Sequence, residues 1–172
     1  MPILTLLSTN NNSNNNCCCR NNNIVVRRRR NTTTVQNTRI AQFTTIGSIL
    51  VDAGDIIPLF NTQFNNISTN VQPNSDGSID ILTQGVYKLE YVAVVQNTSG
   101  STQNFTLQLQ SNGTDIDLTA SMVTLENNQF ATVTNQLILP VFVGTTRNIT
   151  LINNSAQALF IVNANLVVTK LT

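Results

Sequence analysis

The stretch "GVYKLEYVAVVQN", from Gly85 to Asn97, decides the fold because an apolar side chain recurs at every second residue of its centre. Successive side chains of a β-strand point to opposite faces of a sheet, so this period is typical of a strand with one buried face. The residues on the apolar face are Tyr87, Leu89, Tyr91, Ala93 and Val95. The stretch predicts a long strand that packs against a core on one side.

The same alternation recurs along the chain. In "NFTLQLQSNG", Phe105, Leu107 and Leu109 share one face. The "SNGTD" that follows, residues 111–115, predicts a hairpin because Asn-Gly is the strongest short signal for a tight turn between strands. Further strands are predicted at residues 43–51, 56–60, 67–71, 78–82, 116–122, 131–142, 148–153 and 158–171. Many short strands between turns, without a sustained helical period, predict an all-β antiparallel sandwich or jelly roll with almost no helix.

Two predicted strands have apolar residues on both faces. They are "TNQLILPVFVG", residues 134–144, and "LFIVNANLVVTKL", residues 159–171. Such strands fit the middle of an assembly, where the second sheet covers one face and a partner covers the other. A β-bulge near Asn163 would also explain the interrupted alternation. Both explanations remain open at the level of the sequence.

The composition indicates one domain without the usual chemistry of an enzyme. The chain has 172 residues, 41% of them hydrophobic, which suffices for one core. It has no His and only three Cys, all adjacent, so catalytic triads and the common zinc sites lack their groups. Asp115 and Asp117 with Thr114 could bind a metal ion, but such residues are more often solvated parts of turns. We expect no enzymatic activity, no cofactor and no bound metal.

Charge divides the chain into two parts. Charged residues make up only 10% of the chain. Residues 1–39 contain six of the nine basic residues and no acid, whereas residues 40–172 contain the remaining basic residues and all eight acids. The first part is also of low complexity, with an Asn tract and clusters of Cys and Arg. We therefore predict an N-terminal arm at residues 1–39 and a β domain at residues 40–172.

Neither a membrane span nor a secretory signal is expected. No apolar run approaches the ~20 residues that cross a bilayer. The first residues, "MPILTLLSTNNN", hold a short apolar patch without a preceding basic residue, unlike a signal peptide. The expected location is therefore the cytosol, or a surface that the protein reaches without a conventional signal.

Three stretches of the β domain carry a family resemblance: "VDAGDIIPLF" at residues 51–60, "SIDILTQGVYKLEYVAVVQ" at residues 78–96, and the closing "VFVGTTRNITLINNS" with "ANLVVTKL". They resemble the C1q/tumour-necrosis-factor superfamily, most closely the C-terminal domains of collagen-stalk glycoproteins on the exosporium of bacterial spores. The resemblance covers roughly residues 40–172. It implies a jelly roll, a tight homotrimer around a threefold axis, and a role in surface architecture or recognition. The strand residues that we expect in the core or the trimer contact are Tyr87, Leu89, Tyr91, Phe142, Leu166 and Val168.

The arm departs from that family. A stalked exosporium protein would carry Gly-X-Y repeats in front of its domain, whereas this chain has no Gly before Gly47. An extended arm of some 38 residues spans up to about 120 Å, and a domain of this size is about 40 Å thick. The arm is therefore long enough to reach across its own trimer and dock on the next one, and repetition of that contact makes a fibre. The apolar residues expected to dock are Ile3, Leu4, Leu6 and Leu7.

The cysteine triplet of the arm predicts bonds between copies. Cys17, Cys18 and Cys19 are too close to pair with one another in ordinary disulfide geometry, and the chain has no other Cys. Their natural partners lie on other copies, and such disulfides need an oxidising exterior. Free cytosolic thiols and thiol ligation of a soft metal are the alternatives.

The arginine cluster, Arg27, Arg28, Arg29 and Arg30, has two interpretations. It pairs with acids or backbone carbonyls of the domain, or it binds nucleic acid, as the basic arms of jelly-roll capsid proteins do. The capsid interpretation is disfavoured because the arm has no aromatic residue for stacking and the cysteines have no role there. A third possibility is a receptor- or glycan-binding tip whose loops, rich in Asn and Thr, include residues 61–66 and 97–104.

The hypothesis favoured by the sequence is a self-assembling structural protein. Trimers would be linked head to tail by their arms into an extracellular fibre, such as an appendage or exosporium filament on the surface of a bacterial spore. The expected partners are further copies of the chain and an anchoring protein of the spore surface, with no nucleic acid and no membrane.

Overall fold

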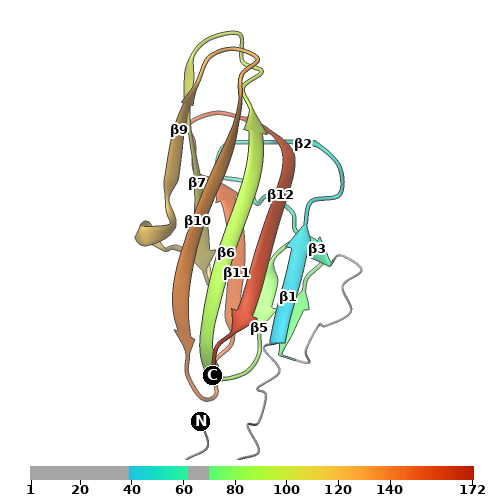
Figure 1. Cartoon of the computed structure of the whole chain (residues 1–172), viewed down its shortest axis with the longest axis vertical. Coiled ribbons are helices and arrows are strands. Elements are labelled where there is room, and N and C mark those ends of the chain that lie inside the picture. Colours follow the sequence, from blue (N-terminus) through green and yellow to red (C-terminus); the bar gives the residue numbers. More distant parts are fainter. Residues whose placement is uncertain (1–38, 62–69) are drawn as a thin grey trace, which may run out of the picture. The chain divides into compact units, whose positions relative to one another are not determined.

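In the computed structural model, residues 39–61 and 70–172 are described, and all of them fall in one compact unit, Asn37–Thr172. Two six-stranded antiparallel sheets face each other (Figure 1). Sheet A consists, in spatial order, of β10 (Phe130–Val141), β6 (Gly85–Gln96), β12 (Leu159–Lys170), β1 (Arg39–Thr44) and β3 (Phe60–Asn61), and β2 (Ile49–Val51) also pairs with β12. Sheet B consists of β4 (Val71–Pro73), β5 (Ile79–Ile81), β11 (Arg147–Asn153), β7 (Gln103–Ser111) and β8 (Thr114–Asp115), and β9 (Ser121–Leu125) pairs with β7.

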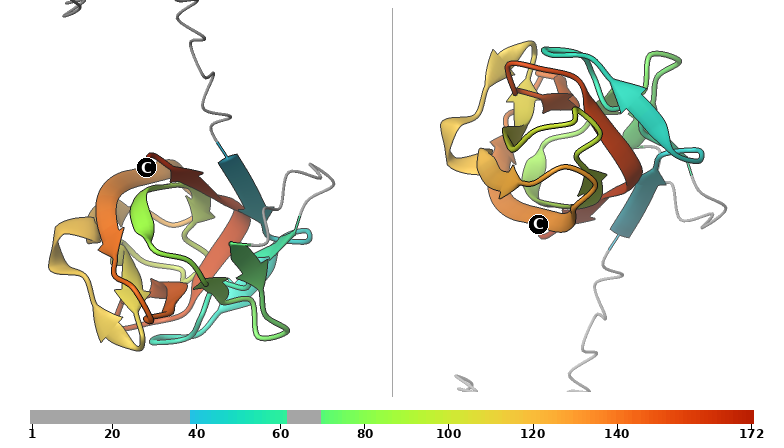
Figure 2. Two further views of the ribbon diagram at one scale, coloured as in Figure 1. Left: turned by 90° about the horizontal axis from the view of Figure 1, so that it is seen from below. Right: turned by 90° about the horizontal axis from the view of Figure 1, so that it is seen from above.

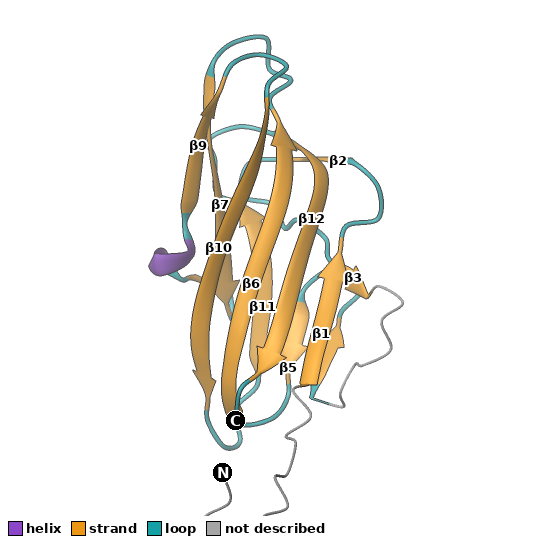
Figure 3. Ribbon diagram, viewed as in Figure 1, coloured by secondary structure: helices purple, strands orange, loops and turns teal. Residues whose placement is uncertain are grey.

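The predicted all-β antiparallel sandwich is confirmed. A single 3-10 turn, Asp117–Thr119, is the helical element of the described residues (Figure 3). The arm and the boundary predicted at residues 39 and 40 stay predictions, because residues 1–38 lie outside the described part of the chain.

The core forms where the alternation of β6 meets that of β7. All five inward residues of β6 predicted from the alternation have no exposed surface. From β7, Phe105, Leu107 and Leu109 close the other side of the core, each at most 1% exposed. Burial stabilises each large apolar side chain by roughly 1.5–3 kcal/mol before ordering costs, so these two strands join the sheets.

The predicted hairpin is confirmed at the turn between β7 and β8. Asn112 and Gly113 have φ angles of +53° and +73°, which is the left-handed pair that a two-residue turn of the primed type requires. The side chain of Asn112 also accepts a hydrogen bond of 2.8 Å from the amide of Asn148. The hairpin is thereby tied to the start of β11.

The strand predicted at residues 43–51 is wrong, because the structure has two strands separated by a turn. β1 and β2 both pair with β12, and the register of β12 shifts between Ile161 and Asn163. The turn between β1 and β2 lies opposite this bulge, where the hydroxyl of Thr45 accepts a hydrogen bond of 3.0 Å from the amide of Ala164. The predicted bulge near Asn163 is confirmed, and it interrupts the neighbouring strand as well.

The strand predicted at residues 116–122 is also wrong. Its first half forms the 3-10 turn, and β9 begins only at Ser121. The hydroxyl of the buried Thr119 accepts from the amide of Leu109 (2.9 Å) and lies 2.7 Å from the carbonyl oxygen of Ile116, to which it donates. Those bonds hold the backbone in a turn at the point where a strand was expected.

Two other predicted strands match the structure only in part. Residues 56–60 contribute an isolated bridge between Ile56 and Ile152 and the first residue of β3. Most of the strand predicted at 67–71 lies outside the described residues, and β4 begins at Val71. The strand predicted at 78–82 contains β5, and those predicted at 131–142, 148–153 and 158–171 match β10, β11 and β12.

The two ends of the sandwich carry different segments. At one end β1 begins at Arg39, opposite Lys170, and the turn from β10 to β11 lies there too (Figure 2, left). We call it the arm end, because the chain enters the sandwich there. The opposite end, called the far end, carries the loops at residues 52–55, 97–102, 126–129 and 154–158 (Figure 2, right).

Buried asparagines organise the loops of the far end. The fully buried amide of Asn97 donates to the carbonyls of Ser101 (2.6 Å) and Leu125 (2.8 Å), and its oxygen accepts from the amide of Ser99 (2.9 Å). Asn153 makes the same kind of contacts with Val51, Asp52, Gln157 and Ser155. In both cases a serine follows the asparagine by two residues, which is the pattern of an Asx turn.

Substitution Asn97→Ala should lower the free energy of unfolding by about 2–3 kcal/mol, because the buried carbonyl of Leu125, the carbonyl of Ser101 and the amide of Ser99 lose their partner. The matched control is Asn104→Ala. Asn104 is exposed and its side chain accepts one hydrogen bond, from Thr124, so the control should stay within about 0.5 kcal/mol of the original protein. Urea unfolding measures both. Equal losses in the two variants would contradict the role given to Asn97.

Burial raises the pKa of Tyr91 above the usual value of 10.0. Its hydroxyl donates to the backbone carbonyls of Thr119 (2.9 Å) and Leu107 (3.2 Å), so the protonated form suits the fold. A raised folded pKa contributes stability that is present below pH 10 and is lost as the pH rises through the folded pKa.

The variant Tyr91→Phe should therefore be less stable by about 1–2 kcal/mol at neutral pH. The difference between the two proteins should shrink as the pH is raised above about 10. Urea unfolding across this pH range tests the expectation. A gap that stays constant with pH would show that the hydroxyl does not carry the dependence.

Candidate assembly surface

The outer face of sheet A is apolar in patches. Along β6 the residues that alternate with the core residues face outward, and they are Val86, Lys88, Glu90, Val92, Val94 and Gln96. Five large hydrophobic residues at outward positions of four strands remain between 39% and 62% exposed: Ile40, Leu50, Val92, Phe130 and Ile138. Patches of exposed apolar side chains are typical of sites of protein association.

Strand register arranges these side chains in rows across the sheet. One row near the far end contains Phe130, Gln96, Phe160 and Leu50. Another row near the arm end contains Ile138, Lys88, Thr169 and Ile40. Four of the five exposed apolar residues therefore lie at two levels, and Val92 lies in the more polar band between them, opposite Thr134 and Asn165.

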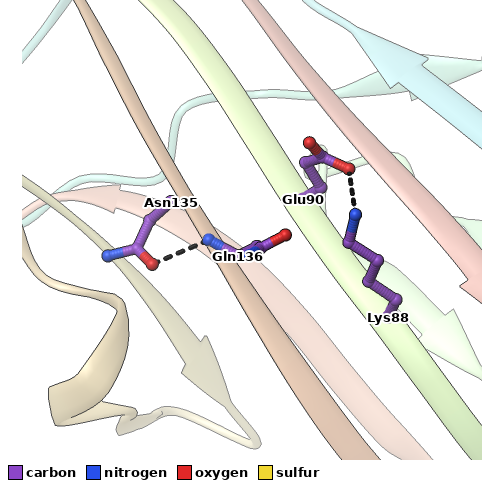
Figure 4. Close-up of polar contacts among 4 residues, drawn as sticks. All are labelled: Lys88, Glu90, Asn135 and Gln136. Carbon is purple, nitrogen blue, oxygen red and sulfur yellow. Dashed lines mark hydrogen bonds and ion pairs between the residues drawn. The ribbon is translucent and has the colours of Figure 1, made fainter.

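An ion pair occupies β6 within this face. Lys88 Nζ lies 2.8 Å from Glu90 Oε2, and both side chains are partly exposed (Figure 4). Residues 39–61 and 70–172 contain no other ion pair. An exposed pair of this kind contributes about 0.2–1 kcal/mol, so its main effect on a covered surface is on register and not on affinity.

One of the two edges of sheet A is protected against strand addition. β10 is this edge, and the amide of Gln136 donates to the side-chain oxygen of Asn135 at 2.7 Å (Figure 4). The carbonyl of Thr134 accepts from the hydroxyl of Ser121 at 3.1 Å, and Pro140 has no amide hydrogen. Occupied edge groups discourage edge-to-edge pairing, so the face of the sheet is the better contact surface.

The outer face of sheet B has a different character. The amide of Asn148 donates to Asp80 at 2.8 Å and to Ser78 at 2.9 Å, and the amide of Gln110 donates to Asp115 at 2.8 Å. Among the described strands of this sheet, Met122 is the exposed large hydrophobic residue. A face covered by amides and hydroxyls that bond to one another suits contact with water.

The strand residues marked for the core or the trimer contact separate into two groups. Phe142 is 64% exposed and follows β10 at the arm end. The others are buried between the sheets, at most 1% exposed, and cannot touch a partner directly: Tyr87, Leu89, Tyr91, Leu166 and Val168. The expected docking residues, the cysteine triplet and the arginine cluster lie outside the described residues.

The interpretation of the two doubly apolar strands is settled in part. β12 lies in the middle of sheet A, and its bulge explains the interrupted alternation. β10 is instead the edge strand, although Ile138 still faces outward and is 62% exposed. The sequence analysis assigned only the buried face of β6, so it gave no role to apolar outer residues such as Val92 and Val94.

The described residues provide no metal cluster and no membrane helix. Residues 39–61 and 70–172 contain no group of three or more potential metal ligands, and Asp115 bonds to Gln110. Within the same residues, no helix has the length and apolar character needed to cross a membrane. The expectation that the protein is not an enzyme stays a prediction.

Solved structures share the two-sheet architecture. Eiger TNF from S. frugiperda is similar with a TM-score of 0.58 at 10% identity, over 78% of this chain and 93% of that chain. The globular domain of zebrafish complement 1qA protein is similar with a TM-score of 0.53 at 12% identity, over 78% of this chain and 98% of that chain. The fold is the C1q/TNF-like jelly roll.

A third similar structure comes from a virus. PRD1 vertex protein P5 is similar to this jelly roll with a TM-score of 0.50 at 18% identity, over 77% of this chain and 96% of that chain. No protein-family model matches the sequence, and no curated protein matches it. The resemblance to the C1q/TNF-like fold is thus confirmed, while the relationship to exosporium glycoproteins stays a prediction.

Proposed function

We propose that three copies of the chain associate through the outer face of sheet A. The observation that supports this choice is the contrast between the two outer faces. Sheet A exposes large hydrophobic residues at two levels, whereas sheet B covers itself with polar side chains that bond to one another. A homotrimer is also what the family resemblance implies, and the occupied edge groups of β10 disfavour contact through that edge.

Substitutions Phe130→Asp and Ile138→Asp should dissociate the trimer, because each would place a carboxylate in an apolar contact at one of its two levels. The matched control is Met122→Asp on the outer face of sheet B, where Met122 is 72% exposed. Light scattering coupled to size-exclusion chromatography measures the mass of each variant, and thermal unfolding checks the fold. The proposal fails if Met122→Asp dissociates the assembly and the sheet A substitutions do not.

We further propose that the trimer is a structural subunit of an extracellular fibre, most plainly an appendage or exosporium filament of a bacterial spore. The position of β1 supports this. The chain enters the sandwich at Arg39, opposite Lys170, so all three arms of a trimer begin at the same end of their domains. Arms that start together and are long enough to reach the next trimer favour linear, head-to-tail assembly.

The parts of the arm then have separate roles. The residues expected to dock, Ile3, Leu4, Leu6 and Leu7, would insert into the neighbouring trimer. The cysteine triplet would lock that contact with disulfides between copies in an oxidising exterior. The proposed partners are other copies of the chain and an anchor on the spore surface, without nucleic acid or membrane.

Deletion of residues 1–19 should abolish fibres and leave discrete trimers, as seen by negative-stain electron microscopy. Replacement of all three cysteines by serine should leave fibres that form but disperse on dilution, and reductant should act on the original protein in the same way. The triple serine variant thus separates docking from covalent locking.

The same images distinguish the remaining functions. Closed shells that contain RNA would replace the fibre proposal with a capsid protein. Discrete trimers that the deletion leaves unchanged would favour a receptor- or glycan-binding tip.

A further inference from the structure

The acidic residues of the domain fall into two groups. All eight acids of the chain lie in its described part. Four carboxylates have partners: Asp76 accepts from the amide of Ser78, Asp80 from Asn148, Asp115 from Gln110, and Glu90 pairs with Lys88. The other four are exposed and make no side-chain hydrogen bond or ion pair within the described residues: Asp52, Asp55, Asp117 and Glu126.

Three of these four unpartnered acids lie in loops of the far end. Asp52 and Asp55 follow β2, and both of their carbonyl oxygens accept hydrogen bonds from Asn153, at 3.1 Å and 3.0 Å. Glu126 opens the turn between β9 and β10, where its amide donates to the side chain of Gln129 at 2.9 Å. Their backbones are therefore held in place, while their carboxylates have no partner among residues 39–61 and 70–172. We call Asp52, Asp55 and Glu126 the acidic rim.

The cations lie toward the opposite end. The described cations are Arg39 and Lys170, which are paired in register at the arm end, Lys88, which lies opposite Thr169, and Arg147, which begins β11. No Lys or Arg occurs in the far-end loops at 52–55, 97–102, 126–129 and 154–158. The remaining five arginines of the chain precede Arg39, in the segment that joins the sandwich at the arm end.

We propose that the acidic rim of one copy binds the arginine cluster, residues 27–30, of the next copy in the fibre. The proposal rests on the head-to-tail assembly described above and adds the charged contact of its junction. Arginine suits the role because its guanidinium group stays charged and forms paired hydrogen bonds with carboxylates. Three rims would face three clusters, so individually weak contacts act together.

The spacing along the chain places the cluster at the junction. Residues 27–30 precede Arg39 by 9 to 12 positions, so they reach at most about 30–40 Å from the arm end. The 12-residue strands span about 40 Å of the sandwich. The arginine cluster could reach the acidic rim of its own domain only if the chain between residue 30 and Arg39 were fully extended. In a head-to-tail stack, the acidic rim of the neighbouring copy lies beside the arm end and is within easier reach. The residues expected to dock are farther from Arg39 along the chain than the arginine cluster is, so they can reach farther into the neighbouring trimer.

The contact also gives the fibre a direction. Two far ends brought together would place like charges opposite each other, and two arm ends would do the same with cations. Opposite charges speed encounter, and salt screens them over about 10 Å at 0.1 M. Head-to-tail addition is therefore favoured over the reversed orientation at low ionic strength.

A peptide binding experiment tests the contact independently of fibre growth. The peptide is a fluorescent copy of residues 21–36. The receptor is the full-length chain with Arg27→Gln, Arg28→Gln, Arg29→Gln and Arg30→Gln, so that its own arms do not compete. Fluorescence anisotropy should show binding at about 50 mM salt that weakens roughly ten-fold or more at about 500 mM.

The rim variant adds Asp52→Asn, Asp55→Asn and Glu126→Gln to the receptor, and the matched control adds Asp80→Asn, Asp115→Asn and Asp117→Asn. Both remove three charges with little change of shape. The rim variant should bind the peptide at least about ten-fold more weakly, and the control should bind as the parent does. Equal weakening in the two variants, or none in the rim variant, overturns the proposal.

Charge reversal guards against a folding artefact. A receptor with Asp52→Lys, Asp55→Lys and Glu126→Lys should bind a peptide whose four arginines are replaced by glutamate, and should reject the original peptide. Failure of both peptides to bind this receptor, when it unfolds at the same temperature as the parent, counts against the contact. Electron microscopy of the original protein separates the two proposals. If the acidic rim binds the peptide but no fibres form, the fibre proposal is overturned and the charged contact stands. If fibres form but the rim does not bind the peptide, only the charged contact is overturned.

Discussion

The packing of β6 is the constraint on which the rest of the molecule depends. The strand runs the length of sheet A between β10 and β12, and its inward side chains have no exposed surface. Because its period is two, this burial also determines what faces outward. Val92 and the pair Lys88–Glu90 lie on the opposite face for that reason alone. One strand thus holds the two sheets together and supplies the centre of the surface proposed for assembly.

The long strands could be predicted from local alternation. The prediction was wrong where contacts between distant segments determine the structure. β6, β7 and the Asn-Gly hairpin follow from residues adjacent in sequence. The break between β1 and β2 depends on a bulge in β12, more than a hundred residues later, which no local pattern contains. In the stretch predicted as a strand at 116–122, Leu118 and Met122 imitate a buried face, yet they are 81% and 72% exposed.

The candidate surface was harder to predict than the fold. Buried positions follow from hydrophobicity, so Tyr87 and Leu89 were identified by pattern. The outward face mixes valines with an ion pair and amides, and its contrast with sheet B appears only when the register aligns distant strands. The unpartnered acids required the structure too, since Asp80 and Asp52 look alike until Asn148 is seen to bond to only the first. The arm at residues 1–39 was inferred from the charge and composition of the sequence, and it stays a prediction because residues 1–38 lie outside the described residues.

The occupied edge groups of β10 have a consequence for encounters between folded copies of the chain. A chain with 10% charged residues and many strands has little electrostatic repulsion to keep its copies apart. An open backbone edge in a crowded cell would nucleate templated cross-β aggregates. Three of those backbone groups are occupied or absent because of Asn135, Ser121 and Pro140. Encounters between folded domains are therefore less prone to irreversible cross-β association.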